Sequence, residues 1–126
     1  MTQKKIVLVA ALSGFLAVAI GAFGAHALKA QLTMNGRSDT FELAVRYQFY
    51  HTLALLAVGI LLEKFPALRT AFYFFVAGII IFSGSLYILS FTNQSLWGAV
   101  TPIGGIALIA GWLSFAYIML KKEDRV

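Results

Sequence analysis

The chain has 126 residues, of which 60% are hydrophobic and only 12% are charged, and its mean hydropathy is +0.85. A chain this apolar is not a soluble domain, and its length suffices for about four membrane spans of ~20 residues but hardly for a further soluble domain. It contains no cysteine, which excludes disulfides, thiolate metal sites and cysteine nucleophiles. The net charge of +5 does not indicate a nucleic-acid partner, because the basic residues lie at the ends of the expected spans rather than on one folded face.

The first expected helix covers residues 6–28 and follows two lysines. A secretory signal peptide has a similar basic start, and His26 lies within a small-x-small pattern that resembles a cleavage site. The apolar run is too long for the roughly 7–15-residue core of a signal peptide, so we expect a membrane span. Small residues recur along it and form a stripe that lets another helix approach closely. The stripe consists of Ala10, Gly14, Ala17, Gly21 and Ala25.

The second expected helix, residues 40–62, carries polar side chains in an otherwise apolar run. At about 100° per residue, Tyr50, Tyr47 and His51 fall within about 140° of Arg46 and share one helix face. Because a charged side chain that faces lipid costs a few kcal/mol or more, we expect this face to turn toward the other helices.

Two of these residues also have a purely structural interpretation. Arg46 can pair with Glu42, which lies four residues before it on the same helix. His51 lies near the middle of the membrane, where desolvation disfavours its charged form. We expect a neutral ring that bonds a hydroxyl such as Ser83 or Ser85, or a backbone carbonyl.

The third expected helix covers residues 66–91, and Pro66 suits its first turn. Gly78 and Ser85 lie seven residues apart on it and indicate a second seam for close packing. Tyr87 adds a hydroxyl near the end of this helix.

The fourth expected helix covers residues 102–120. Thr101 is interpreted as its N-cap and Pro102 as its first residue. Gly104 and Gly105 would leave the first turn bare, so that a ligand could approach the positive end of the helix dipole.

The orientation follows from the Lys and Arg residues outside the expected spans, most of which lie on one side. The residues on that side are Lys4, Lys5, Lys64, Arg69, Lys121, Lys122 and Arg125. Lys29 and Arg37 lie on the other side, so both termini are expected to face the cytoplasm of a cell membrane. The polar residues that this orientation places in the outer half of the membrane are His26, Arg46, Tyr87 and Thr101.

Several segments together are typical of one known family. They are Gly21-Ala-Phe-Gly-Ala-His-Ala-Leu28, Val45-Arg-Tyr-Gln-Phe-Tyr-His51, Phe82-Ser-Gly-Ser-Leu-Tyr87 and Thr101-Pro-Ile-Gly-Gly105, with Gly111-Trp112. On these segments the chain resembles the small four-span membrane proteins known as domain of unknown function 423, the transmembrane protein 256-like proteins. The resemblance covers all four expected spans and implies an integral membrane protein with four helices. It brings no established activity with it.

The first functional hypothesis is binding or transport of an anionic small molecule or lipid headgroup in the outer leaflet. Arg46 offers a planar fork of five donors, His26 a titratable partner, and the helix that starts at Pro102 a positive dipole end. The residues proposed for this site are His26, Arg46, Tyr47, Tyr50, His51, Tyr87, Thr101, Gly104 and Gly105. The same side chains could instead satisfy one another inside the bundle.

A second hypothesis is an enzyme or redox protein that uses His26 and His51 as haem or metal ligands. His51 is expected about 15 Å below the outer end of its helix, whereas His26 lies near that surface, so joint ligation is disfavoured. No third ligand is well placed for zinc, and no Ser-His-Asp arrangement, carboxylate pair or phosphate loop occurs. A proton relay through Tyr47 and the histidines lacks an intramembrane Asp or Glu carrier. We therefore expect no enzyme, no cofactor and no metal.

A third hypothesis is a structural or assembly subunit of a membrane complex, whose small-residue seams bind its own copies or another membrane protein. The polar residues proposed for the binding site would then only hold the helices of the bundle together. The sequence thus predicts an all-α, four-helix transmembrane bundle with membrane lipids as partners, and it leaves the choice between binding and assembly open.

Overall fold

The computed structural model describes residues 1–121, in which all regular secondary structure is helical. The long helical segments in this part of the chain are α1 (Gln3–Ala25), α3 (Ser38–Leu61), the segment from Pro66 to Thr92, and α6 (Leu96–Leu120). The segment from Pro66 consists of a 3-10 turn, η1 (Pro66–Leu68), followed by α4 (Arg69–Gly78), a π-helical turn, η2 (Ile79–Ser83), and α5 (Gly84–Thr92). A short helix, α2 (Lys29–Met34), joins α1 to α3. Lys122 and Arg125, which enter the charge count above, lie outside the described residues.

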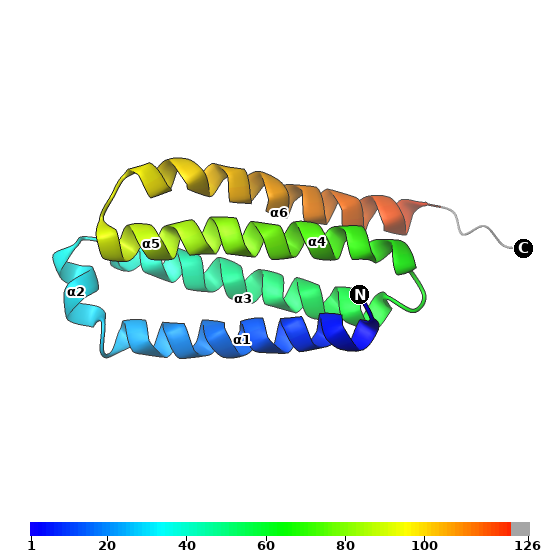
Figure 1. Ribbon diagram of the computed structural model, residues 1–126, viewed down its shortest axis with the longest axis horizontal. Coiled ribbons are helices and arrows are strands. Elements are labelled where there is room, and N and C mark those ends of the chain that lie inside the picture. Colours follow the sequence, from blue (N-terminus) through cyan, green and yellow to red (C-terminus); the bar gives the residue numbers. More distant parts are fainter. Residues whose placement is uncertain (122–126) are drawn as a thin grey trace, which may run out of the picture.

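The long segments lie side by side in a row. α1 packs on α3, α3 packs on α4, η2 and α5, and α6 packs on the other side of these three. α1 and α6 therefore form the two edges of the row, and α1 begins at the same end of the molecule at which α6 finishes (Figure 1). The opposite end carries α2 and the turn between α5 and α6 (Figure 1).

Within residues 1–121, three segments are long and apolar enough to cross a membrane: α1, the segment from Pro66 to Thr92, and α6. α3 has a similar length, 24 residues, but Arg46, Gln48 and His51 lower its mean hydropathy. Three of the four predicted spans therefore have the length and composition that a membrane span needs.

Glycines lie where neighbouring segments pack closely against each other. A Cβ added at Gly14 would lie 3.3 Å from the side chain of Thr52, and one added at Gly21 would lie 3.2 Å from the side chain of Val45. The small-residue stripe of α1 thus packs closely against another helix, as predicted, and that helix is α3. At Gly104 of α6 an added Cβ would overlap the backbone of Phe82 in η2. The π-helical turn thus lies at a close contact with the backbone of α6.

Polar side chains on α3 lie between two apolar clusters. Ala44 belongs to the cluster near α2, whereas Leu55 and Val58 belong to the larger cluster near the start of α1. Gln48 and His51 are buried between them, at 6% and 5% exposure. Burial of amide and imidazole groups is costly without hydrogen-bond partners, so their partners decide what these residues do.

The prediction that the last helix begins at Pro102 is wrong. α6 begins at Leu96 with Ser95 as its N-cap residue, and Pro102 lies inside the helix. Thr101 is no N-cap either, since its hydroxyl donates to the carbonyl of Trp97 at 3.1 Å. Helices in membranes tolerate an interior proline, because neighbouring side chains and helices satisfy the freed backbone groups. Gly104 and Gly105 are therefore interior helix residues and not a bare first turn.

The other helix ends lie close to the predicted ones. α1 ends at Ala25 rather than at residue 28, and α3 covers residues 38–61 rather than 40–62. Pro66 occupies the first turn of its segment, as predicted. The expected break after α1 contains a short helix, α2, and then a turn in which Gly36 adopts a φ of +65°.

Candidate functional site

His51 joins α3 to α6 through both nitrogens of its ring. Its Nδ1 lies 2.8 Å from the carbonyl oxygen of Tyr47, one turn back on α3. The indole Nε1–H of Trp112 donates to its Nε2 at 3.0 Å. An indole can only donate, and a carbonyl can only accept, so the ring must be neutral with its proton on Nδ1. The expected backbone-carbonyl partner is confirmed, and neither ring nitrogen is free for a ligand.

Aromatic packing surrounds this histidine. Tyr47 stacks on Phe82 with ring centroids 4.7 Å apart, and it lies 5.9 Å from the ring of Tyr50. Phe75 and Trp112 contact the imidazole from the other segments. Tyr47 is half-buried, whereas Tyr50 is exposed on the outside of α3. Tyr47 and His51 therefore belong to the helix interface, as expected. The prediction that the whole polar face turns toward the other helices is wrong for Tyr50 and for Arg46, which are exposed.

A second polar group links α1, α3 and α5. Tyr87 donates its hydroxyl hydrogen to Oε1 of Gln48 at 2.6 Å, and Nε2 of Gln48 donates to the carbonyl of Ser13 at 3.0 Å. The hydroxyls of Ser13 and Thr52 lie 2.6 Å apart. Sequence reasoning named Tyr87 but missed Gln48, Ser13 and Thr52. A glutamine in an apolar span, where an unpaired amide is costly, was the signal that could have found this group.

Thr101 and the two glycines lie at the contact between α6 and the segment before it. The hydroxyls of Thr101 and Ser85 are 2.6 Å apart. Gly104 packs on the backbone of Phe82, and the nearest atom to a Cβ at Gly105 would be a ring carbon of Phe82 at 3.8 Å. These residues are brought together by helix packing, and none of them lines a pocket with Arg46.

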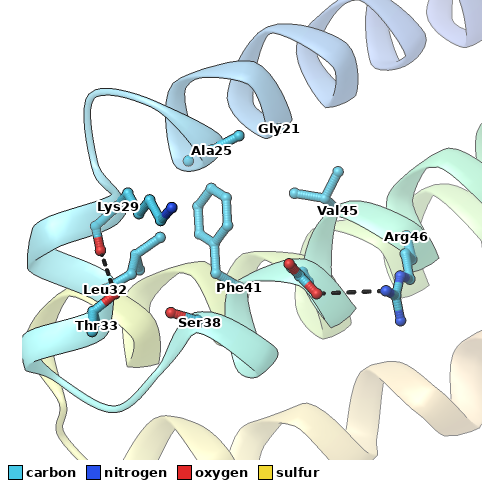
Figure 2. A pocket seen from close by; sticks show the side chains of 11 residues that line it. Gly21, Ala25, Lys29, Leu32, Thr33, Ser38, Phe41, Val45 and Arg46 are labelled. Carbon is cyan, nitrogen blue, oxygen red and sulfur yellow. Dashed lines mark hydrogen bonds and ion pairs between the residues drawn. The ribbon is translucent and has the colours of Figure 1, made fainter.

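Arg46 lines a pocket at the end of the molecule that carries α2. The pocket has a volume of about 460 Å³ and is formed by the end of α1, by α2 and by the first turns of α3. We call it the basic pocket; its lining residues are Gly21, Gly24, Ala25, Lys29, Leu32, Thr33, Ser38, Phe41, Glu42, Val45 and Arg46. Figure 2 shows Lys29 and Arg46 on opposite sides, with the ring of Phe41 between them.

The charges of the basic pocket do not cancel. Nη2 of Arg46 lies 3.5 Å from Oε2 of Glu42, which is the structural pairing expected from the sequence. Both side chains remain more than half exposed, so this pair is worth little in solvent and leaves most guanidinium donors available. Within residues 1–121 this is the only ion pair, so no carboxylate pairs with Lys29. Two cations and one anion leave a net charge of plus one.

The structure distributes the nine residues proposed from the sequence over several places. Tyr47, His51, Thr101, Gly104 and Gly105 lie at helix contacts, and Tyr87 is paired with Gln48. Arg46 lines the basic pocket, and Tyr50 is exposed one turn further along α3. His26 is exposed at the C-terminal end of α1, beside the pocket residue Ala25. His26 and His51 do not form one site, and among the described residues no group of three His, Asp or Glu side chains could hold a metal ion.

Comparison with known proteins places the chain in a family. Residues 20–105 match the family model described as protein of unknown function (DUF423). The UPF0382 membrane protein YwdK of Bacillus subtilis is 39% identical to the chain over 122 residues, which cover 94% of this chain and 98% of YwdK. The UPF0382 inner membrane protein YgdD of Escherichia coli K12 is 39% identical over 130 residues, which cover 98% and 96%.

A Staphylococcus saprophyticus protein, the UPF0382 membrane protein SSP2132, is 43% identical over 112 residues, which cover 88% of this chain and 92% of that protein. No solved structure matches the chain. The family model covers more than half of the chain, and the relatives align along nearly all of it. The chain therefore belongs to the DUF423 family and is a membrane protein, as its sequence motifs predict.

Proposed function

We propose that the protein spans the membrane four times, with α3 as the remaining span and both termini in the cytoplasm. Of the polar side chains that lower the hydropathy of α3, Gln48, His51 and Thr52 are buried, whereas Arg46 is exposed. The exposed charges of Glu42 and Arg46 lie in the first half of α3. From Phe49 onward, the exposed large side chains of α3 are apolar or aromatic, namely Phe49, Tyr50, Leu53, Leu56 and Ile60. A helix with this distribution can face lipid despite its mean hydropathy.

The charges support the same orientation. Lys4, Lys5, Lys64, Arg69 and Lys121 lie at the end of the row where α1 begins and α6 finishes, and Lys29 and Arg37 lie at the other. An excess of Lys and Arg marks the cytoplasmic side of a membrane protein. The basic pocket then lies at the outer surface.

We propose further that the basic pocket binds an anionic group. The observation that carries this proposal is that Lys29 and Arg46 line one pocket and that the single carboxylate of Glu42 offsets only one of them. The start of α3 supports it, because Ser38 lines the pocket and the N-cap residue Arg37 makes no side-chain cap. The first backbone N–H groups of a long helix favour an anion there.

The depth of Arg46 suits a phosphate or carboxylate at the membrane surface. Arg46 lies eight residues into α3, about 12 Å along the helix axis. Its long side chain can reach back toward the interface, where charges are less costly than at the centre of the membrane. A guanidinium binds phosphate or carboxylate through two parallel hydrogen bonds, and the Lys29 ammonium adds a second charge.

The test is native mass spectrometry of protein that has been purified gently from its own membrane, with extraction of the bound lipids in parallel. We expect a discrete anionic adduct on the unmodified protein and its loss from Arg46→Gln and Lys29→Gln. Lys64→Gln, which removes a charge at the opposite end, is the matched control and should keep the adduct. Equal loading of all four proteins would refute the proposal.

A second candidate function is that of a structural or assembly subunit. It is favoured by the complete pairing of the interior, since no buried side-chain nitrogen or oxygen within residues 1–121 lacks a hydrogen-bond partner. His51, Tyr87 and Thr101 then serve as internal glue between helices. The same mass spectra test this function: a second copy of the chain or a foreign membrane protein that stays bound, without an anionic adduct, would favour it.

A further inference from the structure

A second hollow continues the basic pocket along α1 and α3. The two share Gly21, Val45 and Arg46 as lining residues. The second one has a volume of about 330 Å³, and we call it the apolar hollow. Its remaining lining residues are Ala17, Val18, Phe49 and Tyr50.

The two hollows lie one after the other along the axes of α1 and α3. The basic pocket includes Ala25 at the end of α1 and Ser38 at the start of α3. The apolar hollow lies further along both helices, at Ala17 on α1 and at Tyr50 on α3. From Ser38 to Tyr50 is about 18 Å along the helix, which compares with a hydrocarbon depth of about 15 Å for one leaflet. The groove thus has a charged end at the membrane surface and an apolar end near the middle.

We infer that this groove holds one anionic phospholipid, with its phosphate on Arg46 in the basic pocket, where Lys29 adds positive charge, and one acyl chain along the apolar hollow. The inference rests on the proposed function, and it specifies the ligand as a lipid rather than a water-soluble anion. The net positive charge of the basic pocket complements the phosphate. A soluble anion would fill only the basic pocket and would leave the apolar hollow without a role.

The shared residues explain why the two parts are one groove. At the junction of the two hollows, Gly21 has no side chain that could separate them. A Cβ added there would lie 3.2 Å from Cγ1 of Val45, so α1 and α3 pack closely beneath the groove. Arg46 stands at the junction and belongs to both lining sets. Its aliphatic stem can cover an acyl chain while its guanidinium holds the phosphate.

The test is competition binding to the full chain in detergent micelles, with dipalmitoyl phosphatidylglycerol as the lipid probe and glycerol 3-phosphate as the soluble probe. The key variant is Val18→Trp. Val18 lines only the apolar hollow and is 64% exposed. The larger tryptophan ring should therefore occupy the hollow without disturbing the core. Leu8→Trp, on the same helix and 55% exposed but outside the groove, is the matched control.

We expect Val18→Trp to weaken phosphatidylglycerol binding by about tenfold and Leu8→Trp to leave it unchanged. Glycerol 3-phosphate should not displace the lipid at equal concentration. If Arg46→Gln removes the binding of both probes while Val18→Trp changes neither, the basic pocket binds a soluble anion, and the lipid inference is wrong. If Arg46→Gln changes neither, the proposed function itself fails. A second copy of the chain that covers the groove and excludes the lipid would also overturn the inference.

Discussion

Trp112 of α6 donates its indole N–H to Nε2 of His51 on α3, across 61 residues of sequence and at 3.0 Å. Together with the carbonyl of Tyr47 on Nδ1, this bond satisfies both nitrogens of a buried imidazole. The histidine most suggestive of chemistry is therefore a connection between helices.

Replacing Trp112 with Phe should lower the free energy of unfolding by about 1–2 kcal/mol, because Nε2 of His51 loses its donor while most of the aromatic packing stays. The measurement is reversible unfolding in mixed micelles. Trp97→Phe is the control, since the indole of Trp97 forms no hydrogen bond within residues 1–121. The ¹⁵N NMR spectrum of the unmodified protein should in addition show that Nδ1 of His51 carries a proton and that Nε2 does not. Equal stabilities of the two variants would contradict this account.

Tyr87→Phe should destabilise the protein by about 1–2 kcal/mol, because Oε1 of Gln48 then stays buried without a donor. Tyr117→Phe removes a hydroxyl from a residue that is 63% exposed and should have almost no effect. The same unfolding assay compares the two. A similar loss in both variants would show that the Tyr87–Gln48 hydrogen bond contributes nothing specific.

Adjacent glycines on α6 should respond in opposite ways to alanine. Gly104→Ala places a methyl group against the backbone of Phe82 and should cost about 1–3 kcal/mol, since backbone cannot move aside as a flexible side chain can. Gly105→Ala meets only ordinary contact at 3.8 Å, and the better helix propensity of alanine should keep stability equal or raise it by about 0.5–1 kcal/mol. The measurement is the thermal unfolding of both variants and of the unmodified protein in detergent. If Gly104→Ala is the more stable variant, the helices are not as close as the structure indicates.

The proposed topology can be tested by cysteine labelling, because the chain contains no cysteine of its own. Met34→Cys and Gln94→Cys should react with a membrane-impermeant maleimide added to intact cells. Glu63→Cys should react only after the membrane is opened, since it lies at the end of the row that we propose faces the cytoplasm. Labelling of all three from outside, or of Met34→Cys and Gln94→Cys on different sides, would exclude the four-span arrangement.

Much of the helical architecture could be predicted, because it depends on local sequence. Apolar runs of span length and the position of Pro66 mark helices without reference to any partner. The carbonyl partner of His51 lies one turn away on the same helix, so this contact could also be predicted from local sequence. Pro102 was misinterpreted because a proline that starts a helix and a proline inside a membrane helix look alike in sequence.

The site depended on contacts that no local pattern reports. Trp112 meets His51 only because α6 packs beside the segment from Pro66 to Thr92. Lys29 was counted as a loop charge, and it joins Arg46 in the basic pocket only because α2 folds back over the first turns of α3. Gln48 could have been noticed as an amide in an apolar span, but its partners Ser13 and Tyr87 come from helices on either side.

The row of segments also bears on the order in which the chain can assemble. The most extensive contacts join α1 to α3 and α4 to α6, which are successive long helices in each case. If α3 spans the membrane as proposed, each pair can form a helical hairpin as soon as its second helix has entered the membrane, before any later part of the chain is synthesised. Contacts between neighbours in sequence close short loops at low entropic cost. In that case the last step of assembly is the docking of two preformed hairpins through α3 and α5, and the hydrogen bond between Tyr87 and Gln48 at that interface helps to fix their register.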